Sequence, residues 1–125
     1  MTVLFDSWAW IEFFRDGKKA DEVEEYIKKP LAIYISAVTV AEVLRYLLSY
    51  ETKAAAEKSV KFMIHRSVVL HVDTEVAWLA AALKHQHKWG LGDALIYATA
   101  QLNKLHIVTG DSDFKGKPNV IYLGI

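Results

Sequence analysis

The chain has 125 residues and 53% of them are hydrophobic, which is enough for one compact domain over residues 1–125 with a sizeable core. Its 15 Lys and Arg residues equal its 15 Asp and Glu residues, which excludes a global basic field and limits any nucleic-acid binding to a local patch. The absence of cysteine excludes disulfides, thiolate zinc sites and a cysteine nucleophile.

Strand-like and helix-like segments alternate along the chain. Short runs rich in β-branched and aromatic residues predict strands over residues 2–5, 31–35, 68–72, 105–109 and 120–123. Apolar residues at helical spacing predict helices over residues 7–15, 18–29, 36–50, 52–66, 73–87 and 91–103. Strands that alternate with helices are typical of βαβ units, so we expect an α/β fold whose parallel sheet is covered by helices on both faces.

Four acidic residues lie in surroundings that are otherwise uncharged. Asp6, Glu42 and Asp93 are each the only charged residue in a run of eleven or more. Asp111 follows an uncharged stretch of four residues, and Asp113 lies two residues further on. An ionised carboxylate is very costly to remove from water without a partner, and no Lys or Arg is placed in sequence to pair all four acids.

The predicted connectivity places these acids at one edge of the sheet. Asp6 and Asp111 come just after the first and fourth strands, at the carboxyl ends where open parallel sheets bind their ligands. Glu42 lies early in the helix that follows the second strand, and Asp93 lies in the first turn of the helix that leads into the fourth. We therefore expect all four carboxylates at the same rim.

Each acid also has a purely structural interpretation, which the sequence leaves open. Asp6 and Asp93 are both able to cap the helices that follow them. Glu42 points away from the apolar stripe of its helix, as a solvated surface acid does. Asp111 and Asp113 are able to form an Asx turn after a strand.

Carboxylates that are gathered in one place call for a cation. Two like charges about 4 Å apart repel by roughly 4 kcal/mol at an effective dielectric of 20. Mg²⁺ and Mn²⁺ prefer oxygen ligands, and Mg²⁺ also binds substrate phosphate. The five histidines give no zinc pattern, since His85 and His87 fall on different helix faces and the others are scattered. A hydrolytic site that uses Mg²⁺ or Mn²⁺ is the leading interpretation.

Three stretches of the chain resemble the PIN-domain nucleases, and in particular the VapC-type toxins of toxin–antitoxin pairs. VLFDSWAWIEFF is similar to their first strand, its terminal acid and the following helix. SAVTVAEVLR is similar to the helix that supplies a Glu, and LGDALIYATA with IVTGDSDF to the third acid's helix and the T-x-D-x-D-F segment. This resemblance implies a three-layer α/β/α sandwich around about five parallel strands, and metal-dependent cleavage of RNA by a metal-activated water.

The resemblance also assigns roles by position. The implied catalytic, metal-binding acids are Asp6, Glu42, Asp93 and Asp111, with Asp113 as a secondary ligand. Ser7 and Thr109 match hydroxyl positions beside the first and fourth acids, from which they could orient a carboxylate or a water. Ser7 is equally suited to cap the first helix.

A pocket that binds RNA must be ringed by local basic residues, because the chain has no net charge. The candidate phosphate contacts are Arg15, Arg45, Lys115 and Lys117, and an ordinary solvated charge is the alternative for each. Single-stranded or loop RNA is the expected target, since its unstacked bases are reachable.

The first predicted helix carries four aromatic residues within seven positions: Trp8, Trp10, Phe13 and Phe14. Trp8 and Trp10 fall about 200° apart on a helical wheel, so one buried face does not easily take all four, and the surplus is a candidate partner surface. The resemblance implies an antitoxin and a homodimer as partners, and the antitoxin could insert a basic side chain among the acids.

The apolar runs are far shorter than a membrane span, and the N-terminal residues lack the pattern of a signal peptide. A cytoplasmic protein with no membrane partner is therefore expected. Two other functions remain open. A non-catalytic PIN-like module would bind RNA or protein without cutting. A phospho-Asp receiver would need paired acids near the first strand, and a phosphatase of the haloacid-dehalogenase type would need D-x-D where this chain has Asp6-Ser7-Trp8.

Overall fold

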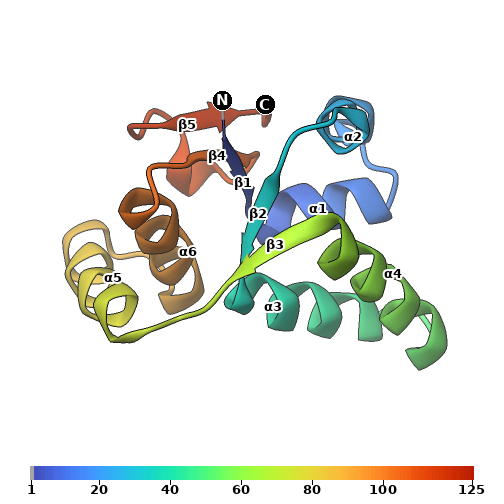
Figure 1. The fold of residues 1–125 in the computed structure, drawn as a ribbon, viewed down its shortest axis with the longest axis horizontal. Helices are drawn as coiled ribbons and strands as arrows, with labels where there is room; N and C mark the ends of the chain where they lie inside the picture. Colours follow the sequence, from blue (N-terminus) through green and yellow to red (C-terminus); the bar gives the residue numbers. More distant parts are fainter. Residues whose placement is uncertain (1) are drawn as a thin grey trace.

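The computed structural model describes residues 2–125, and within them five parallel strands form one sheet in the order β3-β2-β1-β4-β5 (Figure 1). The strands are β1 (Val3–Phe5), β2 (Ile33–Ser36), β3 (Ser67–Leu70), β4 (His106–Thr109) and β5 (Val120–Tyr122). The helices are α1 (Ser7–Phe14), α2 (Ala20–Lys28), α3 (Ala37–Leu48), α4 (Lys53–Arg66), α5 (Thr74–His87), α6 (Leu91–Leu102) and the 3₁₀ turn η1 (Ser112–Phe114). The predicted strands and helices are all confirmed, and each end lies within two residues of its predicted position.

The helices form a layer on each face of the sheet. Helices α1–α4 pack on one face and α5 and α6 on the other (Figure 1), which confirms the expected α/β/α sandwich. Side chains alternate along a strand, so Val3 and Phe5 of β1 join the core under α1–α4, whereas Leu4 joins the core under α5 and α6. No helix within residues 2–125 is both long and apolar enough to cross a membrane.

The aromatic residues of α1 separate into a packed group and one residue that stands apart. Trp10 is fully buried and stacks on Phe14, with ring centroids 5.7 Å apart. Phe13 and Phe14 are half-buried, and their rings lie 6.2 Å and 6.5 Å from that of Phe62 in α4. Core packing therefore accounts for these three aromatic residues, and the fully buried Trp10 gains the most from it. Trp8 lies instead beside the acids described below.

Polar side chains at the ends of two strands start the helices that follow. The Asp6 carboxylate accepts a hydrogen bond from Ala9 N at 3.0 Å and caps α1. The Ser36 hydroxyl accepts one from Val38 N at 3.1 Å and caps α3. The prediction that Ser7 caps α1 is wrong, because the extended backbone and the capping carboxylate both belong to the residue before it. Each such cap stabilises its helix by about 1 kcal/mol and fixes how the chain leaves the carboxyl edge of the sheet.

Candidate metal centre

The carboxyl edge of the sheet contains a hollow of about 250 Å³, which we call the acid pocket. Its lining residues are Asp6, Ser7, Trp8, Ile11, Glu42, Arg45, Tyr46, Asp93 and Asp111. The strand order explains its position. The chain moves outward from β1 to β2 and β3 on one side, and later to β4 and β5 on the other. The acid pocket therefore lies at the topological switch point, where open parallel sheets bind their ligands.

Each acid reaches the acid pocket from a different element. Asp6 follows β1 directly and Asp111 comes two residues after β4, and these two strands are neighbours in the sheet. Asp93 lies in the first turn of α6, and Glu42 lies one turn further along its own helix, α3. The fold thus brings together all four predicted acids from segments that are far apart in sequence.

Asp6 is the most deeply buried of these acids, with 3% of its surface exposed. One carboxylate oxygen accepts a hydrogen bond from Ala9 N, and the other accepts one from the Thr109 hydroxyl. Burial raises the pKa of Asp6 to about 7, against the effect of the two hydrogen bonds, which favour the charged form. The negative charges of Asp111 and Asp93 act in the same direction as burial. Asp6 is therefore ionised at neutral pH only in part unless positive charge is nearby.

Three carboxylates converge where α6 approaches η1. Asp93, Asp111 and Asp113 each offer one oxygen, and these oxygens lie within 4.8 Å of one another. Burial, followed by the negative charges of Asp111, Glu42 and Asp113, raises the pKa of Asp93 to about 6. The Asx turn is present too, because the Asp111 carboxylate accepts a hydrogen bond from Asp113 N at 2.9 Å. Asp113 is exposed, yet it stands with two of the four principal acids.

Glu42 faces the acid pocket rather than open solvent. Its carboxylate accepts a hydrogen bond from the Ser7 hydroxyl at 2.6 Å. A Cβ atom added at Gly92 would lie 2.3 Å from Glu42 Oε2, so the glycine leaves the space that this carboxylate occupies. The interpretation of Glu42 as a solvated surface acid is wrong. Burial of Val43 and Leu47 sets the rotation of α3, and this rotation turns position 42 toward α6.

The Thr109 hydroxyl connects two of the acids. It donates a hydrogen bond to Asp6 and accepts one from Asp111 N at 2.9 Å. Thr109 is fully buried, so these two contacts satisfy its hydroxyl in a place that water does not reach. The contacts fix the orientation of the Asp6 carboxylate and the path of the chain that leads to Asp111.

The four predicted phosphate contacts lie in different places. Arg45 lines the acid pocket. Arg15 lies outside that lining, and its Nε donates a hydrogen bond to Glu12 at 3.2 Å. Lys115 Nζ lies 5.4 Å from the centroid of an aromatic ring in β5, and Lys117 is half-buried after η1. Of these four residues, Arg45 belongs to the lining of the acid pocket and the other three do not. Their contact with RNA stays a prediction.

The sequence did not predict that three further residues line the acid pocket: Trp8, Ile11 and Tyr46. Helical spacing offered a signal for each. Trp8 and Ile11 are three residues apart on the helix that Asp6 caps, and Tyr46 is four residues after Glu42, so each shares a helix face with a neighbour in the pocket.

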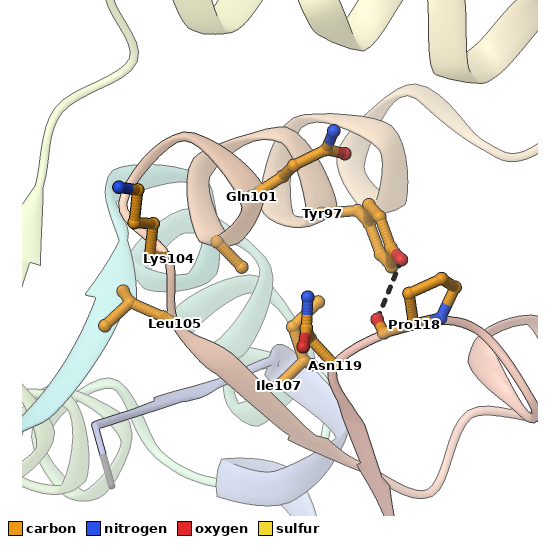
Figure 2. Close-up of a pocket in the computed structure, with 8 residues that line it drawn as sticks. Tyr97, Gln101, Lys104, Leu105, Ile107, Pro118 and Asn119 are labelled. Carbon is orange, nitrogen blue, oxygen red and sulfur yellow. Dashed lines mark hydrogen bonds between the residues drawn. The ribbon is translucent and has the colours of Figure 1, made fainter.

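A separate cleft of about 170 Å³ lies between α6 and the amino ends of β4 and β5 (Figure 2). The Tyr97 hydroxyl closes one side by donating a hydrogen bond to the Pro118 carbonyl at 2.9 Å. Among the described residues that line this cleft, Lys104 is the only charged side chain and none is a carboxylate. The cleft therefore lacks the ligand set that the acid pocket offers.

The chemistry of the acid pocket fits a divalent cation. Within residues 2–125, the ion pairs formed by Lys and Arg involve Glu12, Glu22 and Glu24, and none involves an acid of the pocket. Carboxylate oxygens are the ligands that Mg²⁺ and Mn²⁺ prefer. Among the described residues, the cluster that could hold a metal consists of Asp93, Asp111 and Asp113 and contains no histidine.

A family model for the PIN domain matches residues 3–119 of the chain. No curated protein gives a match. Among solved structures, the chain is similar to a toxin–antitoxin complex from Klebsiella pneumoniae, with 29% identity and a TM-score of 0.82 over 98% of this chain and 99% of that one.

Two more distant structures share the fold. VapC20 of Mycobacterium tuberculosis, a toxin that cleaves the sarcin–ricin loop, is 17% identical with a TM-score of 0.80, over 94% of this chain and 96% of that one. VapBC2 of Rickettsia felis, bound to a DNA fragment from its promoter, is 17% identical with a TM-score of 0.77, over 100% and 99% of the two chains.

Proposed function

The chain belongs to the PIN domain family, and from this premise we propose that it is a metal-dependent endoribonuclease and the toxin of a VapBC-type toxin–antitoxin pair. The observation that carries the proposal is the convergence of Asp93, Asp111 and Asp113 oxygens within 4.8 Å, beside Asp6 and Glu42 in one pocket. This ligand set suits a cation and leaves room for a phosphate of the substrate.

The acids and hydroxyls of the pocket have distinct tasks in this proposal. Asp93 and Asp111 hold Mg²⁺ or Mn²⁺, with Asp113 at the exposed side. Asp6 and Glu42 add negative charge beside the cation. The Thr109 hydroxyl fixes the orientation of the Asp6 carboxylate, and the Ser7 hydroxyl fixes that of Glu42. A cation held there would supply Lewis-acid chemistry: it would neutralise phosphate charge and lower the pKa of a water positioned for in-line attack on phosphorus.

Arg45 is the basic residue of the pocket lining, and in this proposal it binds the phosphate group that is cut. A guanidinium group matches the geometry of phosphate oxygens and stabilises the charge that they gain in the transition state. Arg15, Lys115 and Lys117 lie outside the lining and would contact RNA further from the cut.

The comparisons support RNA as the substrate and a protein as the partner. VapC20 shares the fold and cleaves the sarcin–ricin loop, and the similar Klebsiella pneumoniae structure is a toxin–antitoxin complex. We propose single-stranded or loop RNA as the substrate of this chain and an antitoxin as its partner. A homodimer is proposed from the sequence resemblance alone.

The test is cleavage of a mixed RNA pool, with the cut sites mapped. The wild-type protein with Mg²⁺ or Mn²⁺ should cut, and EDTA should abolish cutting. Asp93→Asn should lower the rate by at least about 100-fold, because it removes a charged ligand at nearly constant volume. Asp21→Asn, on an exposed position of α2, is the matched control and should cut at the wild-type rate. RNA binding without cutting under either metal would favour a non-catalytic module.

A further inference from the structure

A second hollow adjoins the acid pocket and differs from it in charge. It measures about 470 Å³, which falls within the usual size of ligand sites, and we call it the basic groove. Its lining residues are Trp8, Glu12, Arg15, Lys18, Lys19, Gly110, Tyr122, Gly124 and Ile125. Trp8 lines both hollows, so a chain that leaves the acid pocket past this side chain enters the basic groove.

Trp8 is held in place at the boundary by a glycine. A Cβ atom added at Gly110 would lie 2.2 Å from Trp8 Cζ2, so the indole occupies the space above this residue. Gly110 directly precedes Asp111, and Trp8 follows Asp6 by two residues. The half-buried indole therefore stands beside the acids and has part of its surface free.

The basic side of the groove is anchored by a buried carboxylate. Glu12 is 5% exposed and accepts hydrogen bonds from Lys19 N at 2.9 Å and from Arg15 Nε at 3.2 Å. A Cβ atom added at Gly17 would lie 2.3 Å from the Glu12 carboxylate, so the loop between α1 and α2 wraps closely around it. This packing orders a loop that carries Arg15, Lys18 and Lys19.

The charge balance of the groove favours an anion. Three cationic side chains line it: Arg15 is paired with the buried Glu12, Lys19 Nζ lies 3.7 Å from Glu22 Oε1, and Lys18 forms no ion pair among the described residues. The pair of Lys19 with Glu22 is open to solvent and therefore weak, so Lys19 remains able to bind a phosphate. Lys115 Nζ lies 5.4 Å from the ring centroid of Tyr122, another lining residue, which adds positive charge close to the groove. Although the chain has no net charge, the cationic side chains of the basic groove thus lie next to the acids of the acid pocket.

We propose that the basic groove binds the RNA segment next to the scissile phosphate, with a base stacked on Trp8 and backbone phosphates held by Lys18 and Lys19. This inference rests on the proposed function, and it names where the substrate lies outside the acid pocket. Grooves that bind single strands combine cationic side chains with aromatic platforms, and such stacking tolerates any base. An acidic segment of a protein is the competing occupant.

The test compares steady-state cleavage of one mapped oligoribonucleotide by Lys18→Ala/Lys19→Ala, Trp8→Ala and Trp8→Phe variants of the full chain. Lys58→Ala/Lys61→Ala, on exposed positions of α4, is the matched control. Melting temperatures near the wild-type value establish that each variant is folded.

The Lys18→Ala/Lys19→Ala variant, called the groove variant, should raise KM by about 10-fold or more and leave kcat within about twofold. The slope of log(kcat/KM) against the logarithm of salt concentration should become shallower by about 1.4, the value for two lost phosphate contacts to a single strand. Trp8→Ala should raise KM by roughly 5- to 150-fold, and Trp8→Phe should recover most of the loss. If the groove variant keeps its KM and salt slope while the wild-type protein is active, RNA binding in the basic groove is refuted and the proposed nuclease activity still stands. Weaker antitoxin binding with unchanged KM would assign the groove to a protein segment. Inactive wild-type protein would overturn both proposals.

Discussion

The Thr109 hydroxyl donates a hydrogen bond to the Asp6 carboxylate, and so joins the carboxyl ends of β4 and β1 beneath the acid pocket. The same hydroxyl accepts a hydrogen bond from Asp111 N. One buried side chain thus fixes the orientation of the most deeply buried acid and the position of the loop that carries the next one.

Thr109→Val should lower both stability and activity, because it removes a donor from a buried carboxylate and an acceptor from a backbone amide. A buried polar group without its partner costs about 1–3 kcal/mol. Urea unfolding and RNA cleavage measure the two effects. Thr99→Val is the matched control, since its hydroxyl is also buried but donates to the Leu95 carbonyl within α6. It should lose some stability and keep its activity; equal activity in both variants would count against an orienting role for Thr109.

Gly92→Ala should reduce activity without removing any acid. The added methyl group would lie 2.3 Å from Glu42 Oε2, so the carboxylate must move and lose its contact with Ser7. Misplacement of a catalytic group by about 1 Å can lower a rate by roughly 100-fold. Gly90→Ala is the control, since an added Cβ there meets nothing within 4 Å and should leave the cleavage rate unchanged. If both variants cut at the wild-type rate, the position of Glu42 does not matter for the reaction.

The metal-free protein should lose stability as the pH rises. The pKa of Asp6 is raised from 3.8 to about 7 and that of Asp93 to about 6, so the native state binds more protons than the unfolded state between about pH 4 and 7. The free energy of unfolding therefore falls across this interval through these groups and levels off above it. Urea unfolding in EDTA at pH 5 and pH 8 measures the change.

In Asp6→Asn the fall in stability should be smaller, because one of the two titrating groups is gone. Mg²⁺ should stabilise the wild-type protein more at pH 8 than at pH 5, since protons and metal compete for the same oxygens. A wild-type protein whose stability in EDTA changes with pH as much as that of Asp6→Asn would contradict the raised pKa.

The sequence predicted the fold class and the edge at which the acids meet, for a physical reason. Asp6 and Asp111 follow strands, and parallel strands end at the same edge of their sheet, so alternation alone placed them together. Asp93 followed from the antiparallel course of a helix that returns to the next strand. These inferences require only element order, which apolar periodicity encodes well.

Other features could not be predicted because they depend on rotations and loops. The direction of Glu42 depends on how α3 turns about its axis, which its buried residues decide only once the sheet is present. Gly92 and Gly110 leave space for side chains from other elements, and a sequence does not report such close approaches. The basic residues after α1 belong to a loop whose path is set by the buried Glu12 carboxylate.

Titration calorimetry of Mn²⁺ binding to the full chain tests whether the acids of the pocket form a metal site. Asp93, Asp111 and Asp113 offer oxygens within 4.8 Å, and we expect them to form one site. The wild-type protein should bind Mn²⁺, and Asp93→Asn and Asp111→Asn should each weaken binding by at least about 10-fold, whereas the control Asp21→Asn should bind as the wild type does. Equal affinity in the wild-type protein and in both pocket variants would contradict the account.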